Sequence, residues 1–279
     1  MSVVKRIDFK ELAEKARSVR LDVLDMTVAM GGHPTSCFSC VEILTLLYLG
    51  GILKIDPSNP EWSERDRFIL SKGHAAPALY SVLARAGFFA LSHLSQFRVI
   101  GSPYLGMPKQ NISIGIEVTS GSLGQGLSFG LGSVLASRLL HKNYRAYVLL
   151  GDGECDEGQV WQAAMAAAHF KADRLTAIVD YNKYQQTGSV EREMALEPFA
   201  DKWRSFGWHV EECDGHDYSE LQKKLIVAQA VTGRPQVIIA HTKKGKGVSF
   251  MENDYTFHAR SPVGDQLNQA KEEIRNANR

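Results

Sequence analysis

The segment of this 279-residue chain with the clearest chemical character is "GDGECDEG" (151–158), directly after the apolar run "YRAYVLL". Gly151 and Gly153 allow the backbone to turn sharply and to approach a ligand closely. Asp152 offers the hard carboxylate oxygen that Mg²⁺ or Ca²⁺ prefers. A helix expected from about Glu157 would direct its first amide groups toward the same place, which favours a phosphate. The segment therefore predicts a ligand site at the end of a buried strand.

A second polar residue ends the next apolar run, "LTAIVDYN", which closes on Asn182, 30 residues after Asp152. One helix and one strand fill that interval, so in a parallel sheet the two residues would emerge side by side at the strand ends, where such sheets bind ligands. A carboxylate and a neutral amide oxygen bind a divalent ion without cancelling its charge, so the ion can also bridge a diphosphate. Gly-Asp-Gly alone is an ordinary turn, but together with Asn182 it predicts a metal-diphosphate site.

The elements that must position these residues alternate along the chain. Five short β-rich runs precede or separate helical patterns, and they cover residues 67–70, 146–150, 176–181, 208–213 and 236–241. Strands separated by helices pair in parallel through right-handed crossovers. We predict an α/β fold with a doubly wound parallel sheet and helices on both faces, as a single domain over 1–279.

Several segments outside the strands also have a recognisable pattern. Residues 9–29 predict an amphipathic helix. A second helix is expected after Ser39, because Ser39 and Glu42 have the spacing of a capping box. Residues 51–65 and 98–120 are rich in Pro, Gly, Ser and Asn and predict long loops, and the tail over 262–279 is polar and helical in composition.

Composition narrows the class of protein. With 32 basic and 31 acidic residues, bulk charge does not favour nucleic acid or an anionic membrane as a partner. No apolar run has the length of a membrane span, and the N-terminus has no signal region. The four cysteines are too few for a disulfide framework, so a cytoplasmic location is expected. Cys37 and Cys40 form a CxxC, but no second pair accompanies them to make a zinc site.

The segment from 151 to 188, "GDGECDEGQVWQAAMAAAHFKADRLTAIVDYNKYQQTG", resembles the thiamine diphosphate-binding motif in the form that the transketolase family carries. Five further stretches resemble the same family: "GGHPTS" (31–36), "RDRFILSKGHAAPALYSVLA" (65–84), "GIEVTSGSLGQGLSFGLG" (115–132), "FGWHVEECDGHD" (206–217) and "PQVIIAHTKKGKGVSFMEN" (235–253). The resemblance covers about residues 10–260 in order. It implies the thiamine diphosphate-binding fold and an N-terminal subunit of a split transketolase, whose remaining domains lie on a separate chain.

The resemblance also implies a cofactor-binding role for residues of these motifs. Asp152, Asn182 and the backbone carbonyl of Tyr184 would bind the metal, Mg²⁺ in the first place and Ca²⁺ or Mn²⁺ as substitutes. The cofactor-contacting residues would be Gly121, Leu123, Gly151, Asp152, Gly153, Asn182, His74 and His258.

Three histidines are implied as catalytic: His33 of "GHP", His74 of "SKGH" and His258. Histidine suits ketol transfer, because a ketose donor must lose a hydroxyl proton and an aldehyde acceptor must gain one. A histidine outside such motifs is more often a packed or solvated ring, and His216 in "DGHD" is interpreted as a structural turn residue. The basic run "HTKKGKG" (241–247) leaves three interpretations open: a phosphate-binding loop, a solvated turn, or a lid beside the cofactor.

The chain departs from the family pattern at the substrate rim and at the subunit interface. Met107 stands where transketolases carry a histidine that contacts the donor sugar, and Met offers no useful hydrogen bond. Gln162 replaces a glutamate of the family's carboxylate network across the subunit interface, to which Glu157 is linked. The third departure is Ala259, which replaces the glycine after His258.

The expected function is transfer of a two-carbon ketol unit from a ketose phosphate to an aldose acceptor. Thiamine diphosphate and Mg²⁺ would be the cofactors, and a C-terminal subunit with the pyrimidine-binding and third domains would complete a heterotetramer. Two alternatives remain: a specialised ketol or acyl transferase of a biosynthetic or unusual-sugar pathway, as Met107 suggests, and a non-catalytic, cofactor-binding scaffold.

Overall fold

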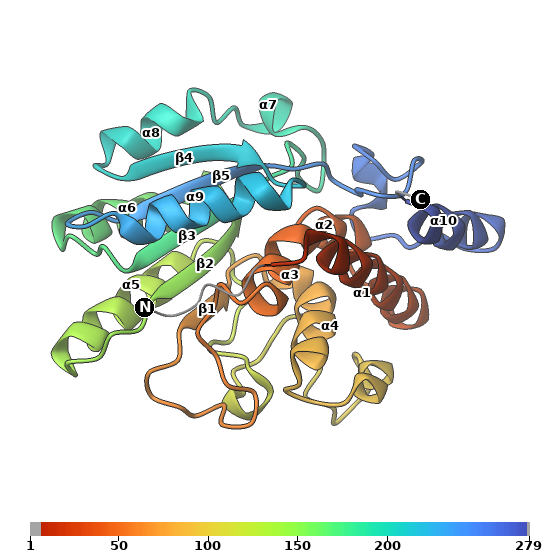
Figure 1. Cartoon of the computed structure of the whole chain (residues 1–279). Helices are drawn as coiled ribbons and strands as arrows, with labels where there is room; N and C mark the ends of the chain where they lie inside the picture. The colour runs from red at the N-terminus through yellow and green to blue at the C-terminus, as the bar shows by residue number, and fades with distance from the viewer. Residues whose placement is uncertain (1–6, 278–279) are drawn as a thin grey trace.

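A five-stranded parallel sheet forms the centre of the computed structural model, which describes residues 7–277 (Figure 1). The strands are β1 (Arg67–Leu70), β2 (Ala146–Gly151), β3 (Leu175–Tyr181), β4 (His209–Asp214) and β5 (Gln236–His241). They pair in the order β1-β2-β3-β5-β4, every pair in parallel. The β-rich runs of the sequence thus predicted each of these strands to within one residue at either end.

Helices cover both faces of the sheet, because alternate side chains of the buried strands point to opposite faces. One apolar core joins α1 (Phe9–Met30), α3 (Val41–Leu49), α4 (Ala76–Ala86) and α9 (Tyr218–Ala230) to residues such as Tyr147 and Leu149 of β2. The other joins α5 (Gly126–Leu139), α6 (Gly158–His169) and α8 (Phe199–Ser205) to Val148 and Leu150 of the same strand. Two shorter helices are α2 (Pro34–Phe38) and α7 (Val190–Glu193). The predicted two-faced α/β fold is confirmed.

Chain direction explains which helix covers which face. The path runs from β2 through α6 to β3 and through α8 to β4, and then returns through α9 to β5 between them. A right-handed crossover that reverses direction must place its helix on the opposite face. All five strands point the same way, so their carboxyl ends form one edge of the sheet.

The helices expected after Ser39 and from about Glu157 are both present, as α3 and α6, but two details of their starts differ from the prediction. Helix α3 begins at Val41 with Cys40 as its N-cap and no side-chain cap. Ser39 donates its hydroxyl to Asp180 at 2.6 Å, and Glu42 pairs with Arg20, so tertiary partners replace the predicted capping box. A 3₁₀ helix, η4 (Gly153–Asp156), lies between β2 and α6. The amide groups nearest the strand end therefore belong to η4.

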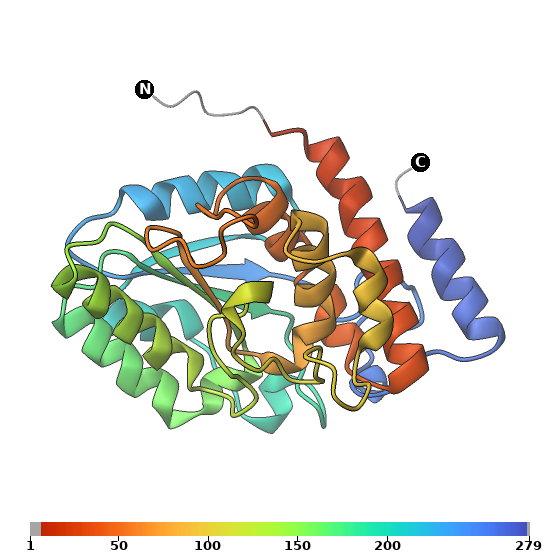
Figure 2. The same ribbon diagram turned by 90° about the horizontal axis from the view of Figure 1, so that it is seen from below.

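The C-terminal segment forms a helix, α10 (Asp265–Asn276), that lies beside α1 (Figure 2). Ala270 and Ile274 of α10 are buried, and Lys271 pairs with Asp25 of α1 at 2.7 Å. The segment predicted as a polar tail thus packs onto the domain with one apolar face.

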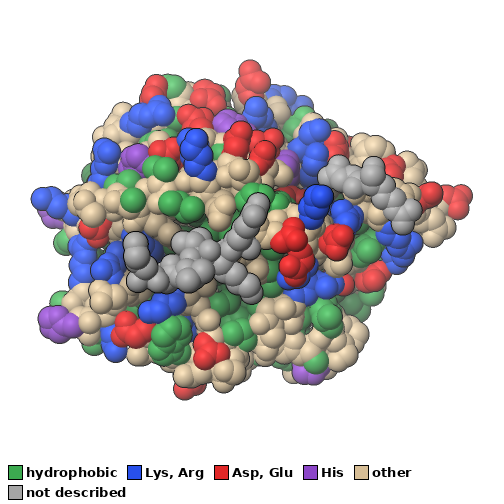
Figure 3. All heavy atoms as spheres, viewed as in Figure 1, with side chains coloured by type: hydrophobic (Ala, Val, Ile, Leu, Met, Phe, Trp, Pro, Cys, Tyr) green, Lys and Arg blue, Asp and Glu red, His purple; other side chains and the backbone are tan. Residues whose placement is uncertain are grey.

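On the face shown in Figure 3, basic and acidic side chains are interspersed. No helix within residues 7–277 is long and apolar enough to cross a membrane.

Candidate active site

The carboxyl-end edge of the sheet borders a cavity of about 300 Å³. Its walls come from the loops after β1, β2, β3 and β5, from the segments before α2 and before α5, and from the segment after the 3₁₀ helix η5 (Tyr255–Phe257). All predicted catalytic, cofactor and metal residues and the predicted rim residue line it: His33, His74, Met107, Gly121, Leu123, Gly151, Asp152, Gly153, Asn182, Tyr184 and His258. The fold therefore brings together residues from motifs spread over more than 200 positions of the sequence.

Asp152 and Asn182 lie at the ends of adjacent strands, since Gly151 of β2 pairs with Asp180 of β3. Asp152 is only 2% exposed, and its carboxylate accepts hydrogen bonds from the backbone amides of Gly153 and Lys183. The side-chain NH₂ group of Asn182 donates to Asp180 at 3.3 Å. The side-chain oxygen of Asn182 therefore points away from Asp180. The pair thus offers one carboxylate and one amide oxygen, the donors that a hard divalent cation prefers.

The electrostatics of Asp152 fit a cation site. Burial, together with the nearby Asp180, raises the pKa of Asp152 to about 7. A divalent cation beside this carboxylate would stabilise its ionised form. Within residues 7–277, no group of three or more His, Cys, Asp or Glu side chains is placed to hold a metal. A metal here would therefore need the mixed set of carboxylate, amide and backbone carbonyl oxygens that the sequence predicted.

Glycines let the cavity walls approach one another. A Cβ atom on Gly73 would lie 2.9 Å from the backbone nitrogen of Gly121, so the segment after β1 packs directly on the "GSLG" loop. Gly121 has φ = +145°, a conformation that L side chains rarely adopt, and Met107 packs against it. Leu123 of the same loop gives the cavity an apolar wall. The walls therefore combine closely packed backbone with an apolar surface.

His33, His74 and His258 form one cluster, with ring centroids 5.1 to 5.6 Å apart. Burial lowers the pKa of His33, lowers that of His74 well below its ordinary value, and lowers that of His258 to about 3. The positive charges of Lys72 and Lys244 act in the same direction. At neutral pH the three rings are therefore neutral, and each can donate one hydrogen bond and accept another.

Two buried lysines in the cavity wall were not predicted as site residues from the sequence. Lys72 is 1% exposed, pairs with Asp180 and donates to the carbonyl of Ser36 at 3.0 Å. Lys244, also 1% exposed, belongs to the run "HTKKGKG", so the structure favours a loop that lines the cavity over a solvated turn. A lysine beside a glycine usually predicts a solvated turn. The burial of these two lysines depends on partners that are distant in the sequence, so it has no local signal.

Glu154 is a third buried residue of the cavity wall, only 3% exposed. Its carboxylate accepts hydrogen bonds from the hydroxyl of Ser71 and from the backbone amides of Gly124 and Gly151, the two amides both at 2.9 Å. It therefore ties the loop of Gly121 and Leu123 to the end of β2. Its position directly after Gly-Asp-Gly was the only sequence signal for this role.

Glu157 and Gln162 do not line the cavity. Both side chains are exposed, and Glu157 lies against Gly124, where an added Cβ would come within 2.8 Å of it. Their predicted role at a subunit interface stays a prediction.

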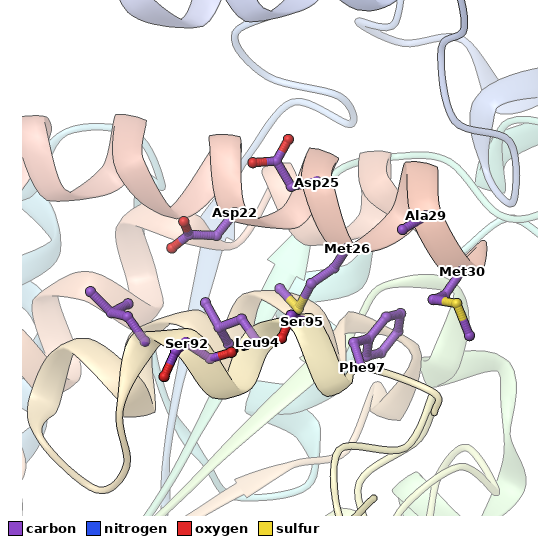
Figure 4. A pocket seen from close by; sticks show the side chains of 10 residues that line it. Asp22, Asp25, Met26, Ala29, Met30, Ser92, Leu94, Ser95 and Phe97 are labelled. Carbon is purple, nitrogen blue, oxygen red and sulfur yellow. Dashed lines mark hydrogen bonds between the residues drawn. The ribbon is translucent and has the colours of Figure 1, made fainter. Parts of the chain in front are cut away.

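A separate cavity of about 430 Å³ lies between α1 and the 3₁₀ helix η2 (Leu91–Gln96) (Figure 4). Met26 and Phe97 line it, and Asp22 and Asp25 lie at its edge. Arg85 pairs with Asp22, and Lys271 pairs with Asp25. This cavity shares no lining residue with the cavity that contains the three histidines.

The fold and the cavity together define an α/β domain in which a buried carboxylate, an amide oxygen and three neutral histidines share one cavity at the carboxyl ends of the strands. Residues 9–276 match the family described as "Transketolase, thiamine diphosphate binding domain". The chain therefore belongs to the transketolase family.

Two relatives are similar over most of their own length. The chain is 42% identical over 249 residues to the 6-deoxy-6-sulfo-D-fructose transketolase subunit SqwG of Clostridium sp. (strain MSTE9), covering 89% of this chain and 90% of that one. It is 39% identical to one subunit of the apulose-4-phosphate transketolase of Phocaeicola vulgatus, covering 88% and 87%. The crystal structure of transketolase from Campylobacter jejuni superposes with a TM-score of 0.89 at 31% identity, over 96% of this chain but only 43% of that one.

Proposed function

We propose that this chain is the cofactor-binding subunit of a two-chain transketolase, which transfers a two-carbon ketol unit from a ketose phosphate to an aldose acceptor. The observation that carries the proposal is the single cavity in which Asp152 and Asn182 lie together with three neutral histidines. The two-chain organisation is supported by the relatives, which are named as subunits and match this chain over about nine tenths of their length.

Thiamine diphosphate and Mg²⁺ are the proposed cofactors, with Ca²⁺ or Mn²⁺ as substitutes. Asp152, Asn182 and the backbone carbonyl of Tyr184 would hold the metal, and Gly151 and Gly153 would leave space for the diphosphate. The loop of Gly121 and Leu123 would contact the opposite end of the cofactor. When bound, thiamine diphosphate supplies the carbanion chemistry that no amino-acid side chain provides.

The histidine cluster is proposed to bind and transfer protons at the sugar hydroxyls. A ketose donor loses a hydroxyl proton as its carbon-carbon bond breaks, and the acceptor aldehyde gains one. Neutral imidazoles can serve both steps, whereas imidazolium rings could only donate. His33, His74 and His258 lie close enough to contact one substrate together, since their ring centroids are at most 5.6 Å apart.

The rim of the cavity would select the substrate, and the exposed surface beside it would bind the second subunit. We assign Met107 to the donor-sugar rim, where it packs on Gly121 and is 38% exposed. Because the two relatives are named for different sugars, the family alone does not name the donor. We assign the exposed Glu157 and Gln162 to the interface with the C-terminal subunit, in a heterotetramer located in the cytoplasm.

Reconstitution tests this function. The chain would be purified alone and together with a partner chain that carries the remaining transketolase domains, and ketol transfer would be assayed with thiamine diphosphate and Mg²⁺. We expect turnover only from the mixture, and none when Asp152→Ala replaces the wild-type chain. Full turnover by the isolated chain would refute the two-chain assignment. Undiminished turnover with Asp152→Ala would instead indicate a scaffold.

A further inference from the structure

Lys244 is a buried cation whose ammonium group faces a histidine of the cluster. Its Nζ lies 3.0 Å from Nδ1 of His258 and 3.1 Å from the hydroxyl oxygen of Ser36. An ammonium group has donors and no acceptor. Nδ1 of His258 must therefore accept, and a neutral ring then carries its proton on Nε2. That nitrogen has no hydrogen-bond partner among the residues that the structure describes.

The protonation states agree with this arrangement. Burial, helped by Lys72, lowers the pKa of Lys244 to about 8, while Asp152 and Asp180 act in the opposite direction. The pKa of His258, at about 3, is far lower. At neutral pH a charged lysine therefore faces a neutral imidazole. The other titratable groups near them are Cys37, His33 and His74.

A chain of buried and half-buried polar groups holds the backbone on both sides of Lys244. The backbone amide of Lys243 donates to Nε2 of His216 at 2.9 Å, so Nδ1 of that ring carries the proton and donates to Glu42 at 2.9 Å. Arg20 pairs with both carboxylate oxygens of Glu42 at 2.8 Å. The same guanidinium donates through Nε to the carbonyl of Lys246 at 2.9 Å. The segment 243–246 is thereby fixed at both ends.

We propose that Lys244 is a positioning residue that fixes the tautomer of His258 with its proton on Nε2, and that His216, oriented by Glu42, holds Lys244 in place. The Nε2–H of His258 then faces a bound group as a hydrogen-bond donor, whereas the opposite tautomer would present an acceptor. Only this consequence for catalysis rests on the proposed function, because the tautomer is a property of the chain itself.

Ring nitrogen NMR reads the tautomer directly and needs no turnover. The protein is labelled with ¹⁵N in its histidine rings, and the His258 signals are assigned by their loss in His258→Gln. At neutral pH we expect a protonated nitrogen at Nε2 and an accepting, unprotonated nitrogen at Nδ1. A proton on Nδ1, or an imidazolium ring, would overturn the proposal. Either result stands apart from the reconstitution assay, so failure of the proposed function would not be confused with failure of this inference.

Variants then test the cause. Lys244→Met should convert the single tautomer of His258 into a mixture, and Lys244→Arg, which keeps a cationic donor, should restore it. His216→Phe should also give a mixture, since it removes the acceptor of the Lys243 amide. Lys243→Met is the matched control, because it removes the same charge one residue away, where the side chain pairs with Glu252 outside the cavity. An unchanged tautomer in Lys244→Met would refute the role of Lys244, and an unchanged tautomer in His216→Phe would refute that of His216.

Discussion

Acid should weaken the fold through Glu42, because this carboxylate is buried in a network of charges. Burial alone would raise the pKa of Glu42, but Arg20 and His216 outweigh it and lower the pKa to about 2, from 4.5 in the unfolded chain. That difference corresponds to about 3 kcal/mol of stability. Since the folded pKa is the lower one, this stability is present above pH 4.5 and is lost as the pH falls toward 2. Glu42→Gln leaves Arg20 buried without its anion, which costs about 3–5 kcal/mol near neutral pH.

Urea unfolding of the wild type and of Glu42→Gln, at several pH values between about 5.5 and 3, measures the effect. We expect the difference in free energy of unfolding between the two proteins to shrink by about 2 kcal/mol over that range, because only the wild type has this titration. Glu11→Gln is the control: Glu11 pairs with Lys15 on the surface of α1 and is 60% exposed, so its loss should cost less than about 0.5 kcal/mol. A difference for Glu42→Gln that stays constant with pH would refute the reasoning.

Three further substitutions separate substrate choice from packing. Met107→His should raise kcat/KM for an ordinary ketose phosphate by about tenfold, since a new hydrogen bond to a sugar hydroxyl contributes about 1 kcal/mol or more; unchanged steady-state kinetics would argue against a rim role. Gly126→Ala places a Cβ against the hydroxyl oxygen of Ser71, closer than van der Waals contact allows, and should destabilise the fold by about 1–3 kcal/mol. Gly132→Ala in the same helix meets no atom within 4 Å and should stabilise it by up to about 1 kcal/mol, as thermal unfolding would show.

The strands and the positions of the main proposed cofactor residues were predictable because local signals agree with the tertiary structure there. A buried parallel strand is a continuous apolar run, and the residue that ends it lies at the edge of the sheet. Asp152 and Asn182 could therefore be placed side by side from their spacing. The motif resemblance then added His33, His74 and His258, which come from three separate parts of the chain.

The supporting residues were not predictable, because their roles depend on partners far away in the sequence. Lys72 and Asp180 are 108 positions apart, and neither has a local sign of burial as an ion pair. Ser39 and Glu42 have the spacing of a capping box, but Asp180 and Arg20 engage their side chains. His216, interpreted as a turn residue, does follow β4, yet its ring also connects Glu42 to the backbone of Lys243.

Binding of thiamine diphosphate to the assembled two-chain protein, titrated by calorimetry with and without Mg²⁺, tests the central claim most directly. We predict Mg²⁺-dependent binding to the wild type and affinity at least about 100-fold weaker with Asp152→Asn, which replaces the proposed metal ligand by a neutral side chain of nearly the same size. Asp173→Asn, at the opposite ends of the strands, serves as the control and should bind as the wild type does. Equal, Mg²⁺-dependent affinity in Asp152→Asn and the wild type would contradict the assignment of the site.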